Sequence, residues 1–473
     1  MLHAGIARVD ITPPLPIDLV GYSRRWEAAT EIRAPLTATA LVLDGHQGRV
    51  AIVAADVPII RPADADLVRI AIGTAIDAPA ENVLLNVSHT HGGPHTHTGG
   101  IKIGGDQRGH SDNELAYIDY LPRQLVAAAQ LATHGLTPVR VAGGAGSIDL
   151  NVNRRERNPE GRMILGWDPD GVCDRDVGVL RFDREDGSPL AIIVNYACHP
   201  VVVGPEDPAV NPDYPGPMRA LLERVTGATC LFLQGAAGNV LPLEGFFDHS
   251  GPERTFGERL AVEALHVADR LEPVATDLVK EDYGSVTPIS LYRHRPLDPQ
   301  PHQPLVVASR VVAFPLKPIP SIEAMEAERQ GYLDQLEQAA ATGAGREILN
   351  PIEYHLNWAD DALRQRREGG DYHEVPAFLQ AIRIGDSVIA AVPGEVFSEM
   401  AVQVKERSSA ATTLFAGYSN GVVSYLPTAA SYPAGGYECD YAHHSYGLIE
   451  QVAPETERIV VDTCVDLIDE LFG

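Results

Sequence analysis

The chain has 473 residues, of which 45% are hydrophobic and 21% are charged, and its formal net charge at pH 7 is −27. This length and composition predict a globular protein with a large core. The negative charge argues against nucleic acid and anionic membranes as partners and leaves a small organic molecule as the expected one.

Segments with strand-like and helix-like patterns alternate from Gly5 to about Pro273. Short apolar runs that end at Gly or Pro predict buried strands, and longer periodic runs predict helices. The predicted strands are 36–43, 49–57, 83–91, 139–143, 177–183, 190–199 and 230–234. The predicted helices are 63–76, 115–131, 218–226 and 252–271. This alternation predicts an α/β fold in which helices cover mixed β-sheets.

Residues 276–375 differ in composition from the rest of the chain. Prolines concentrate between Pro296 and Pro320, and two polar segments with helical patterns follow, at 322–340 and 353–368. We interpret this part as an inserted or peripheral segment within a single domain that comprises residues 1–473. The remaining predicted elements are strands at 377–384 and 387–393 and a final helix at 454–472.

The five cysteines are scattered and form no Cys-x-x-Cys pair, which argues against a disulfide framework and against a thiolate zinc site. The chain has no apolar run long enough to cross a bilayer. Its first residues also lack the basic and apolar regions of a signal peptide. We therefore expect a cytoplasmic protein without membrane insertion, and a homo-oligomer is compatible with the sequence.

The most informative stretch is Ser-His-Thr-His-Gly-Gly-Pro at positions 88–94. It follows an apolar run, so His89 and His91 are expected to leave a strand on the same face. Two imidazoles on one face can hold a metal ion or act as an acid/base pair. They can equally be polar residues that end a strand, so other parts of the chain must decide between these interpretations.

Other strand-like segments also lead into residues of the types that bind metals. His199 and Glu395 each follow an apolar run, and Tyr425 lies in a turn-and-strand segment. Buried carboxylates are rare unless they are paired or bound to a metal. Because the active sites of α/β proteins gather at strand ends, these residues jointly favour a functional site.

These motifs resemble the catalytic domain of the neutral/alkaline, non-lysosomal ceramidases and their bacterial relatives. The resemblance covers most of the chain outside 276–375 and keeps the order of the family's motifs. The matching stretches are Ala4 to Pro13, 88–94, Asn153-Arg154, Ala197 to Pro200, Asp213 to Gly216, Gln234 to Asn239, Pro393 to Glu395, and 420–438. The resemblance implies the α/β fold of that catalytic domain and a hydrolase activity.

The resemblance also implies one zinc ion per chain, held by two histidines, a glutamate and a tyrosine. Matched residue by residue, these ligands are His89, His199, Glu395 and Tyr425. The residues that match the family's catalytic groups are His91, Tyr437 and Arg154. Contacts with the substrate are expected from His95, His97, Asn239 and Leu241. A surface ion pair with Glu156 or another acidic neighbour is the competing interpretation of Arg154.

The implied chemistry is the attack of zinc-activated water on an amide carbon, since zinc lowers the pKa of bound water and polarises carbonyl groups. His91 is expected to protonate the leaving amine. His91 or Tyr437 would help zinc to hold the developing oxyanion, and Arg154 would fix a substrate oxygen.

The sequence departs from the ceramidases where their active site carries a serine. The stretch 238–242 reads Gly-Asn-Val-Leu-Pro, so Leu241 takes the place of that serine. The immunoglobulin-like domain that follows the catalytic domain in the family is also not expected in this chain. We therefore predict a zinc-dependent hydrolase that cleaves an amide bond of a small, non-ceramide substrate. The alternatives are a true ceramidase, an esterase or lactonase, a zinc-assisted lyase or glycan-processing enzyme, and a non-catalytic metal-binding relative.

Overall fold

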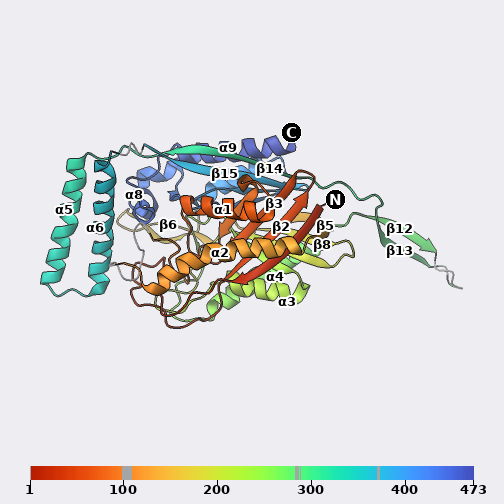
Figure 1. Ribbon diagram of the computed structural model, residues 1–473, viewed down its shortest axis with the longest axis horizontal. Helices are drawn as coiled ribbons and strands as arrows, with labels where there is room; N and C mark the ends of the chain where they lie inside the picture. Colours follow the sequence, from red (N-terminus) through yellow and green to blue (C-terminus); the bar gives the residue numbers. More distant parts are fainter. Residues whose placement is uncertain (1, 99–108, 283–286, 288, 370–372) are drawn as a thin grey trace.

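A computed structural model of the chain describes residues 2–98, 109–282, 287, 289–369 and 373–473. In the body of the molecule, two β-sheets pack face to face and helices cover their outer faces (Figure 1). This architecture confirms the predicted α/β fold with mixed sheets. Within the described part of the chain, no helix combines the length and apolarity that crossing a membrane requires.

The larger sheet has eight strands in the order β10-β9-β8-β5-β1-β2-β3-β4. Its strands are β1 (Leu2–Asp10), β2 (Thr37–Gly45), β3 (Gly48–Ala55), β4 (Val83–Val87), β5 (Thr137–Ser147), β8 (Asp176–Arg184), β9 (Pro189–Tyr196) and β10 (Thr229–Gln234). The backbone N–H of Gln234 donates to Oδ1 of Asn86 at 2.9 Å. The twist that accumulates across the sheet thus brings the carboxyl ends of its two edge strands together.

The side chain of Gln234 links the two chain segments that leave these strands. Its amide donates to the carbonyl oxygen of Ser88 at 3.0 Å and to that of Cys198 at 2.8 Å. Ser88 and Cys198 directly precede His89 and His199. A single buried amide therefore fixes the separation between the segments that carry these two histidines.

The smaller sheet has the order β14-β15-β16-β18 and lies against the inner face of the larger one. Its strands are β14 (Leu305–Pro315), β15 (Glu374–Ile384), β16 (Ser387–Ala391) and β18 (Thr412–Ala416). Ile382 and Leu414 of this sheet share one buried cluster with Leu41 and Ile52 of the larger sheet. Because side chains alternate along a strand, Val42 and Val53 face the opposite way, toward the helices.

Six helices cover the outer faces of the two sheets. The larger sheet is covered by α1 (Pro62–Ile76), α2 (Asp112–His134), α3 (Pro215–Thr226) and α4 (Pro252–Asp269). The smaller sheet is covered by α7 (Ser398–Arg407) and α9 (Thr456–Phe472). The start of α2 is fixed by a capping box, in which Ser111 and Glu114 each accept a hydrogen bond from the other's backbone N–H.

Short elements fill one end of the sandwich. β6 (Asn151–Arg157), β7 (Met163–Asp168) and β11 (Val240–Pro242) form a three-stranded sheet, and β17 (Glu395–Val396) pairs in parallel with β19 (Tyr425–Leu426). The short helix α8 (Tyr437–Asp440) and the 3-10 helix η3 (Ala442–Tyr446) lie near them. These irregular segments surround the site described below.

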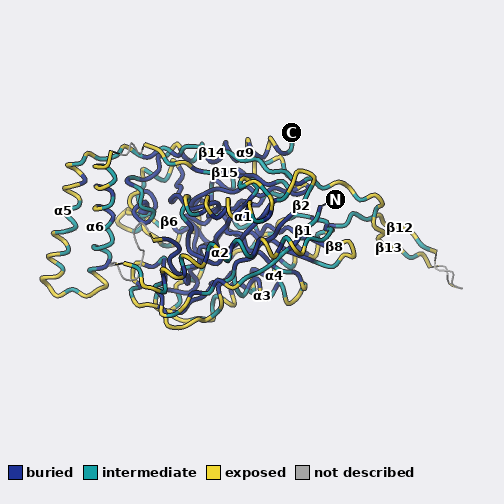
Figure 2. The backbone as a smooth tube through the Cα atoms, viewed as in Figure 1, coloured by how far each residue is buried: buried dark blue, intermediate teal, exposed yellow. Residues whose placement is uncertain are grey.

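Residues 276–375 consist of three different parts, apart from 283–286, 288 and 370–372, which lie outside the described residues. The hairpin of β12 (Thr276–Asp282) and β13 (Ser290–Pro296) projects from one end of the molecule, and β14 belongs to the smaller sheet. The helical hairpin of α5 (Ile322–Ala341) and α6 (Arg346–Arg367) stands at the opposite end (Figure 1). Figure 2 shows that both hairpins are far more exposed than the body.

Several predicted boundaries were wrong, and two of them bear on the site. The predicted strand 83–91 ends at Val87, because Ser88 and His89 turn away and His89 has a left-handed φ of 63°. The predicted helix at 353–368 begins earlier, at Arg346, and contains Pro351. The strands β6 and β7 and the helix α7 were not predicted at all.

Candidate metal centre

Four strands of the two sheets lead into one buried site. His89 follows β4 and His199 follows β9, while Glu395 and Tyr425 follow β16 and β18 through short loops. The parallel pairing of β17 with β19 sets Glu395 directly opposite Tyr425. The structure therefore brings together all four residues that the family resemblance assigns to zinc.

These four side chains are almost completely buried, with exposed fractions between 1% and 6%. Oε2 of Glu395 lies 3.2 Å from Nε2 of His199 and 3.5 Å from Nε2 of His89. The phenol oxygen of Tyr425 lies 3.5 Å from Nε2 of His199. Two imidazole nitrogens, a carboxylate and a phenol thus converge, which is a donor set that suits zinc.

The orientation of the two imidazoles is fixed from behind. Nδ1 of His89 donates to the carbonyl oxygen of Pro58, and Nδ1 of His199 donates to that of Ala237, both at 2.6 Å. With the proton on Nδ1, each Nε2 keeps a free lone pair that faces the centre. Burial, with the nearby charge of Arg154, lowers the pKa of His199 to about 4, so this imidazole is neutral at pH 7.

Two phenols hold the carboxylate of Glu395. Tyr418 donates to Oε2 at 3.1 Å, and Tyr446 donates to Oε1. Burial raises the pKa of Glu395, but the nearby imidazoles of His89 and His199 and the Tyr446 phenol outweigh it. The pKa therefore lies well below its usual range, and Glu395 is ionised in the folded protein.

His91 joins this group from the loop that follows β4. Its Nε2 lies 3.4 Å from Nε2 of His89, and the ligand atoms of His89, His91 and His199 all lie within 4.8 Å of one another. These three histidines could hold a metal ion. Unlike the other two, however, His91 has no hydrogen-bond partner at its buried Nδ1 among the described residues. Burial and the neighbouring His89 lower the pKa of His91 well below its usual value.

The proximity of His89 and His91 does not arise as the sequence suggested. The two residues do not share a strand face, because β4 ends before both of them. The left-handed backbone of His89 turns the chain instead, and the two rings meet edge to face with centroids 5.0 Å apart. Gly21 makes room for His91, since a Cβ atom there would lie 2.5 Å from Cγ of the imidazole.

Arg154 lies beside the centre and is paired within the core. Its Nε donates to Oε1 of Glu438 at 2.8 Å, and Nη1 lies 3.4 Å from Nε2 of His199. Its Nη2 is buried and has no protein partner among the described residues. The competing interpretation is right that Arg154 pairs with an acidic residue, which is Glu438, but wrong about a surface location, because Arg154 is only 3% exposed.

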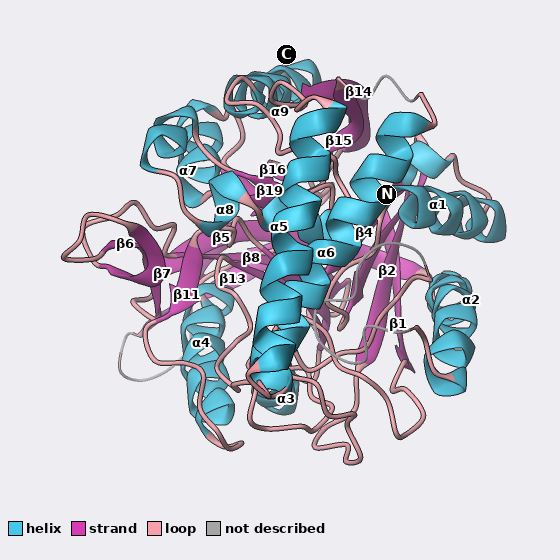
Figure 3. Cartoon of the chain, turned by 90° about the vertical axis from the view of Figure 1, so that its left-hand side faces the viewer, coloured by secondary structure: helices cyan, strands magenta, loops and turns pink. Residues whose placement is uncertain are grey.

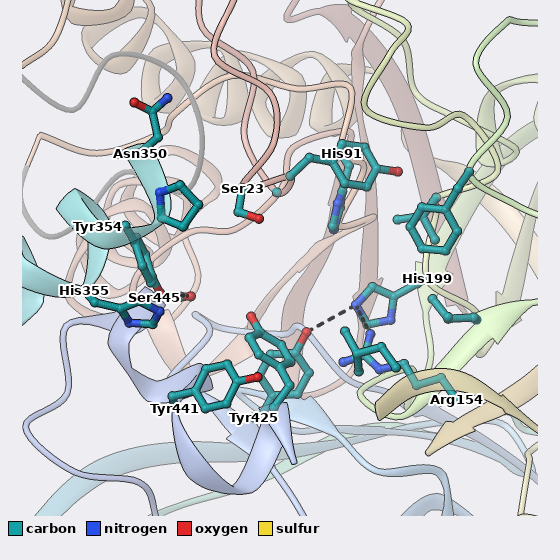
Figure 4. Close-up of a pocket in the computed structure, with 18 residues that line it drawn as sticks. Ser23, His91, Arg154, His199, Asn350, Tyr354, His355, Tyr425, Tyr441 and Ser445 are labelled. Atoms are coloured by element: carbon teal, nitrogen blue, oxygen red, sulfur yellow. Dashed lines mark hydrogen bonds between the residues drawn. The ribbon is translucent and has the colours of Figure 1, made fainter. Parts of the chain in front are cut away.

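A cavity of about 420 Å³ opens over the centre (Figure 4). His91, Arg154, His199, Tyr425 and Tyr437 line its inner part. In Figure 4, His91 and His199 lie on one side of the cavity, and Tyr354 and His355 of α6 face them from the other. A volume of this size suits a small organic ligand.

The N-terminal part of the chain matches the model of a known protein family. Residues 2–235 match the family model described as "Neutral/alkaline non-lysosomal ceramidase, N-terminal". Residues 2–235, just under half of the chain, therefore carry the N-terminal domain of this ceramidase family. A search of curated proteins found no match.

Two solved ceramidase structures share the fold. The crystal structure of neutral ceramidase from Pseudomonas aeruginosa is 20% identical, with a TM-score of 0.67 over 99% of this chain and 74% of that one. A structure of a ceramidase complex is 19% identical, with a TM-score of 0.66 over 100% of this chain and 75% of that one. The likeness in fold thus extends past the matched half into the part that carries Glu395 and Tyr425.

Within this ceramidase fold, three residues predicted to contact the substrate lie elsewhere. Asn239 is fully buried, and its side chain bonds to the backbone N–H of Ser398 and to Glu399. His95 and His97 are buried outside the cavity, because the turn after His91 carries the chain away from it. Leu241 does line the cavity.

Several residues of the site were missed by the sequence analysis. Tyr418 and Tyr446 hold Glu395, Glu438 pairs with Arg154, and α6 supplies one wall of the cavity. Glu438 follows the predicted Tyr437 directly, so a search for a buried counter-charge to Arg154 could have considered it. The other partners are distant in sequence, and no local pattern marks them.

Proposed function

We propose that this protein is a zinc-dependent hydrolase that cleaves an amide bond of a small, non-ceramide substrate. The observation that carries the proposal is the convergence of two backbone-anchored imidazoles on one ionised carboxylate at the base of a cavity. Membership of the ceramidase family supports a hydrolase. Zinc, the amide bond and the cytoplasmic location are parts of the proposal that rest on the sequence resemblance and on the chemistry of the site.

The proposed zinc ligands are His89, His199, Glu395 and Tyr425. The neutral imidazoles and the single carboxylate would leave the ion with a net positive charge, and zinc in such a site activates water and polarises a carbonyl. The phenol of Tyr425 is a weak donor, because burial raises its pKa well above the usual value. Such a site keeps room for a water molecule or a substrate oxygen beside the protein ligands.

His91 is the proposed proton carrier. It is neutral in the folded protein, because burial lowers its pKa. A neutral imidazole can take a proton from the attacking water and give it to the nitrogen of the leaving amine. Its edge-to-face contact with Tyr22, with ring centroids 4.7 Å apart, holds the ring in place for both transfers.

Arg154 and Tyr437 are the proposed donors to the substrate's carbonyl oxygen. The free N–H groups on Nη2 of Arg154 have no protein partner among the described residues. Burial raises the pKa of Tyr437 to about 12, so its hydroxyl stays protonated and can donate at neutral pH. Donors that face developing negative charge in a water-poor site lower the barrier to amide hydrolysis.

Leu241 distinguishes the proposed substrate from ceramide. It lines the cavity at the position where the ceramidases that the sequence resembles carry a serine, and it packs with Tyr22 and Val201 in an apolar cluster. A leucine there offers no hydrogen bond to a substrate hydroxyl. The metal ligands are retained while this lipid-specific contact is lost, which favours a different amide.

The test combines metal analysis with a substrate screen. The purified protein is expected to hold about one zinc ion per chain and to lose turnover of short N-acyl compounds on chelation. Glu395→Gln should lose both zinc and turnover. The matched control is Glu399→Gln, which changes a nearby carboxylate that bonds to Asn239. Full activity of the metal-free protein, or no hydrolysis of any N-acyl compound, would contradict the proposal.

A further inference from the structure

Helix α6 gives the cavity a wall that the proposed chemistry does not use. Asn350, Pro351, Tyr354 and His355 line the cavity, and their spacing places them on one face of the helix. In Figure 3, α5 and α6 lie side by side across the near face of the molecule. The wall therefore comes from the helical hairpin rather than from the two sheets that carry the metal centre.

This wall is anchored firmly to the segment behind the site. Trp358 of α6 stacks on His444, with ring centroids 3.5 Å apart, and its indole N–H donates to the carbonyl oxygen of Leu448 at 2.8 Å. The hydroxyl of Tyr354 lies 2.6 Å from that of Ser445. The next residue, Tyr446, bonds to Glu395, so the wall has a fixed position relative to the centre.

The wall presents hydrogen-bonding groups without formal charge. Its polar members from α6 and from the neighbouring loops are Asn350, Tyr354, His355, Tyr441 and Ser445. His355 is neutral because burial lowers its pKa, and its Nδ1 shares a hydrogen bond with Nδ1 of His444 at 3.0 Å. Hydroxyl, amide and neutral imidazole groups can each donate and accept, which matches the needs of a substrate hydroxyl.

Another part of the cavity lining is apolar. Its members are Tyr22, Leu165, Val201, Leu241 and Phe246. Among the described residues that line the cavity there is no carboxylate, and the guanidinium of Arg154 is already paired with Glu438. A charged group on the substrate would therefore lack a counter-charge, and burying it would be unfavourable.

We infer that the α6 wall binds an uncharged, hydroxyl-rich part of the substrate, so that the substrate class is an N-acylated polyhydroxy amine such as an N-acylated amino sugar. This inference rests on the proposed amide hydrolysis. The rings of Tyr354 and Tyr441 can pack against the carbon-bound faces of a sugar ring while the hydroxyls bond to the polar groups. An alkyl chain in this place would leave the remaining hydrogen-bonding capacity of those polar groups unused and shielded from water, which disfavours long-chain lipid amides.

The test compares two acetamides that differ in their hydroxyl groups. N-acetyl-D-glucosamine carries a hydroxylated ring, and N-cyclohexylacetamide carries a plain ring of similar size. The zinc-loaded protein is expected to prefer the first by about a hundredfold in kcat/KM, because a site built to bind hydroxyls rejects an analogue without them. Faster hydrolysis of N-cyclohexylacetamide, or of a long-chain N-acyl sphingoid base, would overturn the inference.

Substitutions on α6 test whether its side chains produce the preference for the sugar amide. Tyr354→Phe and Asn350→Leu should each lower kcat/KM for the sugar amide about tenfold more than kcat/KM for N-cyclohexylacetamide, through lost hydrogen bonds, with unchanged zinc content. The matched control is Tyr332→Phe on α5, whose hydroxyl bonds to Glu328 at the surface. Equal losses on both substrates would show that these side chains only support the fold and would overturn the inference.

A binding measurement separates this inference from the proposed function. If no N-acyl compound in the screen is hydrolysed, the proposed amide hydrolysis is wrong, and calorimetric titration of the metal-free protein with N-acetyl-D-glucosamine still tests the wall. Binding of the sugar that Asn350→Leu weakens about tenfold would support the hydroxyl-binding wall alone. Absence of binding, or binding that Asn350→Leu leaves unchanged, would overturn it.

Discussion

The phenol of Tyr418, two residues after the end of β18, donates a hydrogen bond to the carboxylate of Glu395, a candidate metal ligand. The phenol donates at 3.1 Å to Oε2, the same oxygen that faces the Nε2 atoms of His89 and His199. The ring of Tyr418 also lies against that of His89, with centroids 4.7 Å apart. One side chain thus fixes a carboxylate and an imidazole together.

Removal of the Tyr418 hydroxyl should weaken metal binding without unfolding the protein. We expect Tyr418→Phe to lower zinc affinity about tenfold to a hundredfold, as for other groups that orient metal ligands. Competition with a chromophoric chelator measures the affinity. Tyr432→Phe is the matched control, because its hydroxyl donates to the carbonyl oxygen of Val452 instead. Equal affinities for the two variants would show that Tyr418 does not position Glu395.

The two roles proposed for the histidines can be separated. His199→Ala should lose both zinc and turnover, since His199 is a proposed ligand with an anchored Nδ1. His91→Ala should keep zinc but lose turnover by about a hundredfold or more, as expected for a proton-transfer group. Metal analysis and N-acyl hydrolysis of the same preparations provide both readouts. If His91→Ala releases zinc to the same extent as His199→Ala, His91 is a ligand.

Gly21 should control the position of the His91 ring. An alanine Cβ at this position would lie 2.5 Å from Cγ and Nδ1 of His91, so the ring would have to move. Gly21→Ala is expected to reduce turnover at least about tenfold while zinc content is unchanged, because small displacements of a proton-transfer group are costly. Steady-state kinetics and metal analysis test this expectation.

The control for Gly21→Ala must carry the same backbone strain. Gly48→Ala serves, since the φ of Gly48 is 105°, close to the 104° of Gly21, and no atom lies within 4 Å of the added Cβ. It should lose some stability and keep its turnover. A similar loss of turnover in both variants would attribute the effect to strain rather than to His91.

His443 should make the folded state less stable in acid. Burial, with the charge of Lys317, lowers its pKa from 6.5 to about 3. Between these values only the unfolded chain binds the proton, so the free energy of unfolding falls as the pH falls, by up to about 1.4 kcal/mol per pH unit. His443→Phe should remove this part of the slope between pH 6 and pH 4.

Urea unfolding of the metal-free protein at several pH values measures that slope. The exposed His249→Phe provides the control and should keep the slope of the original protein, because its imidazole is not buried. If His443→Phe and His249→Phe show the same dependence on pH, His443 does not contribute to acid sensitivity.

The layered part of the fold could be predicted because each of its elements carries a local pattern. The buried strand β4 and the helix α1 were recognised from their apolar periodicity. β6 was missed because Asn151–Arg157 is rich in charged residues, which usually indicates an exposed segment. Its two buried arginines are stabilised by Glu438, a partner that only the folded chain brings close.

The candidate site could be predicted only as far as family motifs reach. The motifs identified His89, His199, Glu395 and Tyr425, which the structure places together, but they gave no indication of Tyr418. Asn239 does not line the cavity, and a motif position does not reveal the direction of a side chain. Its amide oxygen instead accepts a hydrogen bond from the backbone N–H of Ser398, the first residue of α7. The wall formed by α6 depends on tertiary packing, so no local pattern could reveal it.

The amide of Gln234 has a consequence for how the centre is assembled during synthesis. The segments that it joins, after β4 and β9, are complete once the ribosome has passed β10, so a nascent chain can pair His89 with His199 early. Glu395 is synthesised later, after strands β15 and β16 of the smaller sheet. A truncated copy would therefore hold two imidazoles without the carboxylate and would retain zinc poorly. If the centre binds zinc as proposed, stable metal occupancy would thus mark a chain that has been made and folded beyond Tyr425.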